Sequence, residues 1–586
     1  YIQPSLDTLS VLEKVVSQVY GCIGGQVLNG IGVAMSKSSL RAAQNLYEFL
    51  LQRASRPYLE MLAKWVCEGR LEDPYGEFFI SENTRSGDEK AGMPGADFWQ
   101  RHFNMEEAHV PHFLQTCKEK VFHAGKYLNV FSSSAPSFEL EEPSQRMLRA
   151  LLVYSARRQD YMDAVDAAYR RASAALLRLF MERSPNGLDL PGKLTSMRSF
   201  FFLSRADWFG QFMDTAIQEL EKPAAEVPLT RLEGLLDMAL RTSSVSQDCS
   251  REDISCSLHN FRIEDACNRM ARSHGATRGE DLDEDDASER SVRSTAPMTA
   301  AGSRGPDVAE KASPTERATS GGTMATESSG VRCFTLKYRT SWPLSVVFSG
   351  AQLVKYQVIF RHLFYCRYVE RKLVEVWVDH QSTKELGLDK NFSPSYTLRQ
   401  RMLHFCREYI YYATVEVLEP QSHSFLASLE SAETLDVVMS NHERFLDTCL
   451  REILLTERES LYKQLSRILG TCLSFACDMP SFADFDGPSS GQRTSTVGRR
   501  EWLKPLSERR LSVLHQPTYS SSISRFKVIF ETQLQGFLRQ IRHETTHRYE
   551  HFLSNMLTRL DYNDYYSGAL GHVGSTPPSG DLDAKG

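Results

Sequence analysis

Apolar residues recur at three- and four-residue spacing along most of the 586-residue chain, which is the periodicity of amphipathic helices. In the first half this pattern is strongest over residues 39–68, 159–182 and 198–221. In the second half it returns over residues 398–419, 432–456, 458–477 and 522–560. No β-rich run alternates with these windows, which argues against a parallel α/β sheet. The pattern therefore predicts an all-α fold.

Interruptions of this pattern divide the chain into predicted domains. Residues 271–330 are rich in Ser, Thr, Gly, Ala and charge, and they include the acidic run EDLDEDD at 280–286. Such a composition buries too little apolar surface to offset the entropy of ordering. We predict a helical domain over 1–242, a mostly disordered linker over 243–332, a second helical domain over 333–566 with a polar loop at 480–516, and a disordered tail over 567–586.

Two shorter segments have patterns of their own. The glycine-rich stretch GCIGGQVLNGIG, residues 21–32, has neither the glycine spacing nor the flanking strand of a nucleotide-binding motif, so it predicts a loop. The stretch FTLKYRTSWPLSVVFS, residues 334–349, alternates at first and contains Pro343. It predicts an extended segment that leads into a helix at Ala351.

Composition and charge exclude several classes of function. The formal net charge of −6 argues against general binding of nucleic acid, which requires a basic surface. The 12 cysteines include no Cys-x-x-Cys pair and indicate a reducing, intracellular setting. No run of about 18 uncharged apolar residues occurs, so we expect no membrane insertion. Because the sequence starts at Tyr1 inside a helical pattern, we expect the natural chain to be longer.

The segment RHETTHRYEH matches the His-Glu-x-x-His pattern of zinc peptidases. His543 and His547 would share one helical face as zinc ligands, and Glu544 would activate a water molecule. A catalytic site needs a third ligand, but no Glu follows His551, and a single straight helix does not supply three ligands in a peptidase. The alternative is a polar helix end in which the histidines have no catalytic role.

Another near-match is GLDLPGKLT, residues 187–195, which resembles a phosphate-binding loop. Leu194 stands where a magnesium-ligating Ser or Thr is required, and a helical pattern precedes the segment where a strand is required. We therefore predict that this segment is a structural loop, and for the chain we predict no catalytic residues, no metal and no cofactor. What remains is a large helical protein that presents surfaces, for which a helical adaptor of another kind, such as a tethering-complex subunit, is an alternative function.

The stretch YQVIFRHLFYCRYVERKL, residues 356–373, combines helical length with an unusual number of cations and tyrosines. On a helix, Arg361, Tyr365, Tyr368 and Lys372 would share one face, flanked by Arg367 and Arg371. Such a face could meet an acidic protein surface, because Tyr and Arg commonly anchor interfaces. The alternative is a solvated face whose long side chains cover the core.

Motifs in both halves resemble the gamma-tubulin complex component family. In the second half these are WPLSVVFS (342–349), residues 356–373, TLRQRMLHF (397–405), YYATVEVLEP (411–420), HERFLDTCL (442–450) and LTRLDYNDYY (557–566). In the first half they are DPYGEFF (73–79), FWQRHF (98–103), GKYLNV (125–130) and FFLSRADWFGQFMD (201–214). The resemblance covers most of the chain in the family's order, although the linker and the 480–516 loop lack a clear counterpart.

The resemblance implies an elongated stack of helical bundles in two halves, named the GRIP1 and GRIP2 regions. In that family the N-terminal half packs against neighbouring components, such as component three, and the C-terminal half holds one gamma-tubulin. It implies a non-enzymatic scaffold without a cofactor, since GTP belongs to the tubulin. It also implies a role in microtubule nucleation and minus-end capping, in the cytoplasm and cytoskeleton, at a microtubule organising centre or spindle pole.

The resemblance also favours the interface interpretation of the 356–373 helix. The predicted gamma-tubulin-binding residues are Arg361, Tyr365, Arg367, Tyr368, Arg371 and Lys372, with Arg401 and Arg407 added from the next helix as weaker candidates. An acidic partner would be attracted to such a cationic surface.

Overall fold

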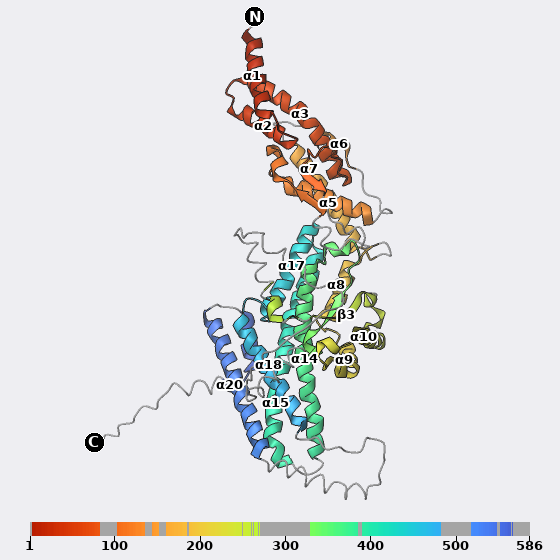
Figure 1. Cartoon of the computed structure of the whole chain (residues 1–586), viewed down its shortest axis with the longest axis vertical. Helices are drawn as coiled ribbons and strands as arrows, with labels where there is room; N and C mark the ends of the chain where they lie inside the picture. The colour runs from red at the N-terminus through yellow and green to blue at the C-terminus, as the bar shows by residue number, and fades with distance from the viewer. Residues whose placement is uncertain are drawn as a thin grey trace, which may run out of the picture. The chain divides into compact units, whose positions relative to one another are not determined.

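The computed structural model describes residues 3–82, 102–134, 143–151, 160–183, 187–248, 250–259, 261, 263–267, 269, 329–384, 389–481, 517–547, 551–563 and 565–566. The described residues are predominantly helical, which confirms the predicted all-α fold (Figure 1). They belong to two compact units. The first consists of Tyr1–Arg198, Tyr338–Val354 and Ser422–Leu446, and the second of Ser199–Lys337, Lys355–Gln421 and Asp447–Gly586. The predicted domain boundaries stay predictions.

The first unit is a helical bundle with one short β-ribbon. Its helices are α1 (Gln3–Val19), α2 (Gly25–Lys37), α3 (Arg41–Glu68), α5 (Lys118–Ser134), α6 (Gln145–Leu151), α7 (Asp160–Met181), and most of α8 (Leu190–Phe201), α16 (Glu419–Glu430) and α17 (Leu435–Glu452). Strands β1 (Ile80–Glu82) and β2 (Phe103–Met105) pair antiparallel, with Ile80 opposite Met105. Short 3₁₀ turns lie at η1 (Glu107–His109), η2 (His112–Leu114) and η7 (Leu344–Val346).

Helices α3 and α5 pack closely because Gly125 makes room for a tryptophan. The Trp65 side chain is fully buried and donates its indole N–H to the Val121 carbonyl at 2.9 Å. A Cβ atom at Gly125 would lie 2.0 Å from the Trp65 ring, so a larger residue cannot replace the glycine without moving the helices. The glycine of the GKYLNV motif therefore has a packing role.

A half-buried carboxylate joins three helices of the first unit. Tyr127 on α5 and Tyr169 on α7 both donate their hydroxyl groups to the carboxylate of Asp436 on α17. Burial raises the pKa of both phenols well above the ordinary value, and the nearby Asp436 carboxylate adds to this effect. The tyrosines therefore remain protonated donors at neutral pH.

The second unit consists mainly of helices. They are α9 (Asp207–Leu220), α10 (Leu229–Thr242), α13 (Gly330–Cys333), α14 (Gly350–Lys384, from Lys355 on), α15 (Asp389–Tyr411), α18 (Glu459–Ser481), α20 (Pro517–His547) and α21 (His551–Leu560). A π-helix, η8 (Tyr412–Leu418), continues directly from α15. Strands β3 (Ile254–Leu258) and β4 (Phe334–Tyr338) form a two-stranded sheet. The 3₁₀ turns are η3 (Ala224–Glu226), η4 (Ser244–Gln247) and η5 (Arg251–Asp253).

Aromatic rings bury α14 against α9 and β4 in this unit. Phe364 on α14 meets Phe209 of α9 edge-on, with ring centroids 5.5 Å apart. Phe334 of β4 lies between Phe212 and Phe364, at 5.2 and 5.0 Å. Each such ring removes a large apolar area from water, so these contacts stabilise the packing of α14 against α9 and β4.

Three sequence predictions differ from the structure in detail. The predicted glycine-rich loop at 21–32 is wrong, because Gly25–Lys37 form helix α2. The window 198–221 contains two helices, α8 and α9, with a break near Leu203. Within the predicted linker, η4, η5, β3 and α13 are regular elements, and residues 271–328 lie outside the described residues, as do 482–516 and 567–586. In the described part of the chain, no helix is long and apolar enough to cross a bilayer.

Candidate protein-binding face on helix α15

The predicted basic and aromatic strip of α14 is covered by the chain itself. No side chain from residue 355 to residue 373 is exposed. Arg361 is 3% exposed, and Tyr365 and Tyr368 are also buried. The expectation that these three side chains face solvent is therefore wrong.

Arg361 binds backbone carbonyls rather than solvent. Its Nη2 donates to the carbonyl oxygens of Phe261 and Arg332, both at 2.7 Å, and its Nε donates to Arg332 at 3.2 Å. Its guanidinium lies 5.0 Å from the centre of the Phe261 ring. Burial lowers the pKa of this guanidinium, but it stays charged at neutral pH. Arg361 thus fastens the segments around β3 and α13 to α14.

The rest of the strip meets acidic residues of α9 and its C-terminal end. The Tyr368 hydroxyl donates to Glu221 at 3.2 Å, and the Lys372 ammonium lies 2.7 Å from the same carboxylate. Arg371 pairs with Asp214 of α9. The acidic surface that the strip was predicted to meet therefore belongs, in large part, to the same chain.

The two remaining α14 residues of the prediction are also engaged. Tyr365 accepts a hydrogen bond from Arg332 at 2.8 Å. Arg367 pairs with Glu370 at 3.0 Å and is partly exposed. No observation places gamma-tubulin on any of these residues, so their role in binding stays a prediction.

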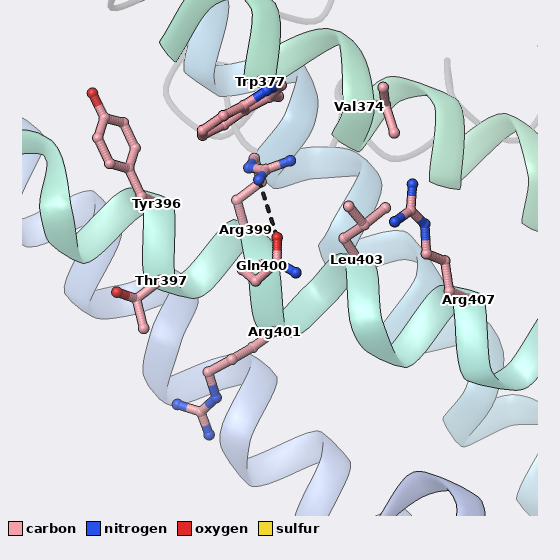
Figure 2. A pocket seen from close by; sticks show the side chains of 9 residues that line it. All are labelled: Val374, Trp377, Tyr396, Thr397, Arg399, Gln400, Arg401, Leu403 and Arg407. Atoms are coloured by element: carbon pink, nitrogen blue, oxygen red, sulfur yellow. Dashed lines mark hydrogen bonds between the residues drawn. The ribbon is translucent and has the colours of Figure 1, made fainter. Parts of the chain in front are cut away.

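Arg401 points away from α14 and contacts α20 and the segment after α21 (Figure 2). It pairs with Glu531 of α20 and donates to the Tyr566 hydroxyl at 3.1 Å. Its guanidinium also lies 5.5 Å from the ring of Tyr565. Arg401 therefore ties the LTRLDYNDYY motif to α15, and its side chain is only partly accessible.

Arg407 is the most exposed of the eight predicted residues, with 54% of its side chain accessible. It lies in a row of exposed or part-exposed positions along α15 and η8, which we call the α15 stripe: Thr397, Gln400, His404, Arg407, Tyr411 and Val415. The spacing of three and four residues keeps this row on one helical face. Val415 lies in the π-helix η8, and π-helical segments are frequent at functional sites. This supports a functional role for the face.

A groove of about 680 Å³ borders the α15 stripe on the α14 side. Figure 2 shows its lining residues: Val374, Trp377, Tyr396, Thr397, Arg399, Gln400, Arg401, Leu403 and Arg407. Arg399, Leu403 and Arg407 extend from α15 toward α14, whereas Arg401 extends to the opposite side (Figure 2). We call this feature the α14–α15 groove.

A second hollow, of about 580 Å³, borders the stripe on the α21 side. It is lined by His404, Glu408, Asn555, Thr558, Arg559 and Tyr562. Arg559 pairs with Glu416 at 2.6 Å and lies 4.1 Å from the centre of the Tyr411 ring. The α15 stripe is thus a ridge between two hollows, a shape suited to protein recognition.

The zinc-peptidase alternative meets a structural obstacle at Glu544. Its carboxylate pairs with the buried Arg458 at 2.6 Å and accepts a hydrogen bond from Gln540 at 3.1 Å. Its role in the described structure is therefore an ion pair that joins α20 to the segment before α18. Among the described residues, no group of three His, Cys, Asp or Glu side chains is placed to hold a metal ion.

Sequence reasoning missed Trp377, Tyr396 and Arg399 as residues of the face. A signal was available in residues 397–407, because Arg399, Leu403 and Arg407 follow one another at four-residue spacing and so share a face.

Comparison with known proteins identifies the family. The family description "Gamma tubulin complex component C-terminal" matches residues 190–566, and "Gamma tubulin complex component N-terminal" matches residues 1–183. The chain belongs to the gamma-tubulin complex component family. The α15 stripe and the α14–α15 groove lie within the part that matches the C-terminal description.

Relatives within this family include component 2 proteins, and the sequence motifs resemble that component. Gamma-tubulin complex component 2 from Mus musculus is 29% identical over 97% of this chain and 60% of its own length. The Arabidopsis thaliana component 2 is 29% identical over 92% of this chain and 70% of its own length. The spindle pole body component alp4 of Schizosaccharomyces pombe is 29% identical over 81% of this chain and 62% of its own length. The chain thus spans only part of these relatives.

Proposed function

We propose that the chain is a non-enzymatic scaffold subunit of the gamma-tubulin complex that binds gamma-tubulin through the α15 face of its C-terminal domain. The names of the relatives support membership of that complex. Neighbouring components, including component three, would bind the N-terminal domain. The chain would act in the cytoplasm and cytoskeleton, at a microtubule organising centre or spindle pole, which agrees with the name of the alp4 relative.

The observation that carries this proposal is the α15 stripe between its two hollows. It combines the exposed cation Arg407 with the exposed side chains of Tyr411 and Val415. Aromatic residues and Arg are enriched at the centres of protein interfaces, and a cationic surface speeds the approach of an acidic partner. The covered strip of α14 offers no comparable surface, because its side chains are buried or only partly exposed.

The scaffold would promote nucleation without making or breaking a bond. Association of free tubulin subunits costs translational and rotational entropy before the first lateral contacts form. A row of scaffold subunits would hold gamma-tubulins side by side and so remove much of that cost in advance. The same row, once bound, would cap microtubule minus ends.

A matched pair of double variants tests the proposed face. Arg407→Glu with Val415→Asp places two negative charges on the α15 stripe, and we expect at least a tenfold loss of gamma-tubulin capture, about 1.4 kcal/mol. The control, Arg539→Glu with Val528→Asp, makes the same change of charge at exposed positions of α20. Capture is measured by pull-down with the tagged chain, and circular dichroism checks the fold. Equal capture by the two variants would remove the α15 stripe from the interface.

A further inference from the structure

Arg399 is a buried cation whose hydrogen bonds go only to neutral groups. It is 6% exposed, and its guanidinium lies 4.8 Å from the centre of the Trp377 ring. Its Nη1 donates to the Leu373 carbonyl at 3.4 Å and its Nη2 to the Gln400 side chain at 3.2 Å, while its Nε has no acceptor among the described residues. Burial, together with the nearby Arg407, lowers the pKa of Arg399. A buried charge is normally paired, whereas no anion pairs with this arginine in the part of the chain that the structure describes.

The other arginines of the α14–α15 groove already have carboxylate partners. Arg401 pairs with Glu531, and Arg407 pairs with Glu370 at 3.0 Å. Neither carboxylate lines the groove, and none of the nine residues that line it is acidic. Among the described residues, no carboxylate pairs with Arg399. The groove is therefore a cationic hollow with one unsatisfied guanidinium in its wall.

The remaining lining is apolar and aromatic. Trp377 and Val374 come from α14, and Tyr396 and Leu403 from α15 (Figure 2). The volume of about 680 Å³ is in the range of pockets that enclose ligand groups of several atoms. Such a lining favours an extended group with an apolar stem and a charged end, and the planar guanidinium of Arg399 suits a carboxylate at that end.

We propose that the α14–α15 groove receives a Glu or Asp side chain from an acidic peptide segment of the protein that the α15 stripe binds. This inference rests on the proposed function, which makes gamma-tubulin that protein. The carboxylate would accept hydrogen bonds from Arg399, with Arg407 at the rim, and the flanking peptide would pack on Trp377 and Val374. The groove would thus act as the anchor pocket of the interface, whereas the stripe supplies the surrounding contact.

Titration with acetylated hexaglutamate tests the carboxylate specificity directly. We expect the full chain to bind hexaglutamate, as measured by calorimetry at low salt, and to bind hexaglutamine or an equal charge of inorganic phosphate at least tenfold more weakly. Arg399→Gln should weaken hexaglutamate binding at least tenfold, and the control Arg539→Gln less than twofold. Failure to bind hexaglutamate, equal losses in the two variants, or a preference for phosphate would each overturn the proposal.

A second variant avoids any change to the buried arginine. Val374 lies partly exposed in the lining of the groove, so Val374→Glu would place a carboxylate of the chain itself in the groove. We expect it to reduce hexaglutamate binding at least tenfold, whereas Val528→Glu on α20 leaves it unchanged. Equal binding by these two variants contradicts the anchor pocket even if Arg399→Gln does not fold.

Gamma-tubulin capture separates failure of this inference from failure of the proposed function. If the wild-type chain captures gamma-tubulin and Val374→Glu captures it equally well, the anchor pocket is wrong and the scaffold proposal stands. If the wild-type chain captures none, the proposed function fails, and the assignment of the groove to gamma-tubulin fails with it.

Discussion

Replacing Arg361 by methionine separates a structural role from a binding role for the covered strip of α14. The variant keeps an apolar stem of similar length but removes the donors to the Phe261 and Arg332 carbonyls. An unsatisfied buried carbonyl costs ~1–3 kcal/mol. The substitution also removes a buried charge, and the Nη1 atom of Arg361 has no acceptor among the described residues. Removing this group offsets part of the cost. We expect a net loss of about 2–4 kcal/mol in the free energy of unfolding.

Thermal unfolding followed by fluorescence measures this effect. A loss of this size should lower the Tm of the second unit by roughly 4–16 °C, at about 2–4 °C per kcal/mol for a large domain. The control Arg539→Met changes an exposed position of α20 and should shift the Tm by no more than about 2 °C. An unchanged Tm for Arg361→Met, together with lost gamma-tubulin capture, would show that Arg361 belongs to an exposed interface and would refute the structural role.

Three further predictions concern buried groups elsewhere in the chain. Asp436→Asn should cost about 1–3 kcal/mol of stability, because Tyr127 and Tyr169 lose a charged acceptor; a Tm equal to that of the exposed control Asp163→Asn would contradict this. Glu544→Gln should lower the Tm by breaking a buried ion pair, and the chelator-free wild-type chain should carry no zinc by metal analysis; about one zinc per chain would revive the peptidase alternative. Burial lowers the pKa of His362 from 6.5 to about 4, so the folded chain holds this side chain neutral at neutral pH. About 3 kcal/mol of the free energy of unfolding is therefore lost as the pH falls from 6.5 to 4. In denaturant titrations the stability of His362→Gln should depend less on pH than that of the wild-type chain, and an equal dependence would argue against this assignment.

Local periodicity predicted the long helices well. The windows 39–68 and 159–182 correspond to α3, Arg41–Glu68, and α7, Asp160–Met181. The predicted loop at 21–32 is wrong because a glycine-rich stretch without a nucleotide-binding motif can also be helical. In α2, Gly25 instead allows close packing, since a Cβ atom there would lie 1.8 Å from the His109 carbonyl oxygen. That contact is distant in sequence, so the local pattern does not contain it.

The candidate site was harder to predict for the same reason. Arg361 is charged, and a helical pattern places charged residues toward solvent. Its partners, Phe261 and Arg332, lie 100 and 29 residues away and cover the side chain. Conversely, Arg407 was a weaker candidate from sequence but is the most exposed of the eight residues. Which cations are covered is decided by tertiary packing, whereas the family resemblance came from motifs that the sequence shows directly.

The most direct test of the scaffold proposal is the mass of the complex formed by the purified chain and purified gamma-tubulin. Mass photometry of the mixture should show a 1:1 complex, and the Arg407→Glu, Val415→Asp double variant should require at least tenfold more gamma-tubulin to form it. Two separate species at every concentration, with the wild-type chain folded, would contradict the claim that this chain binds gamma-tubulin.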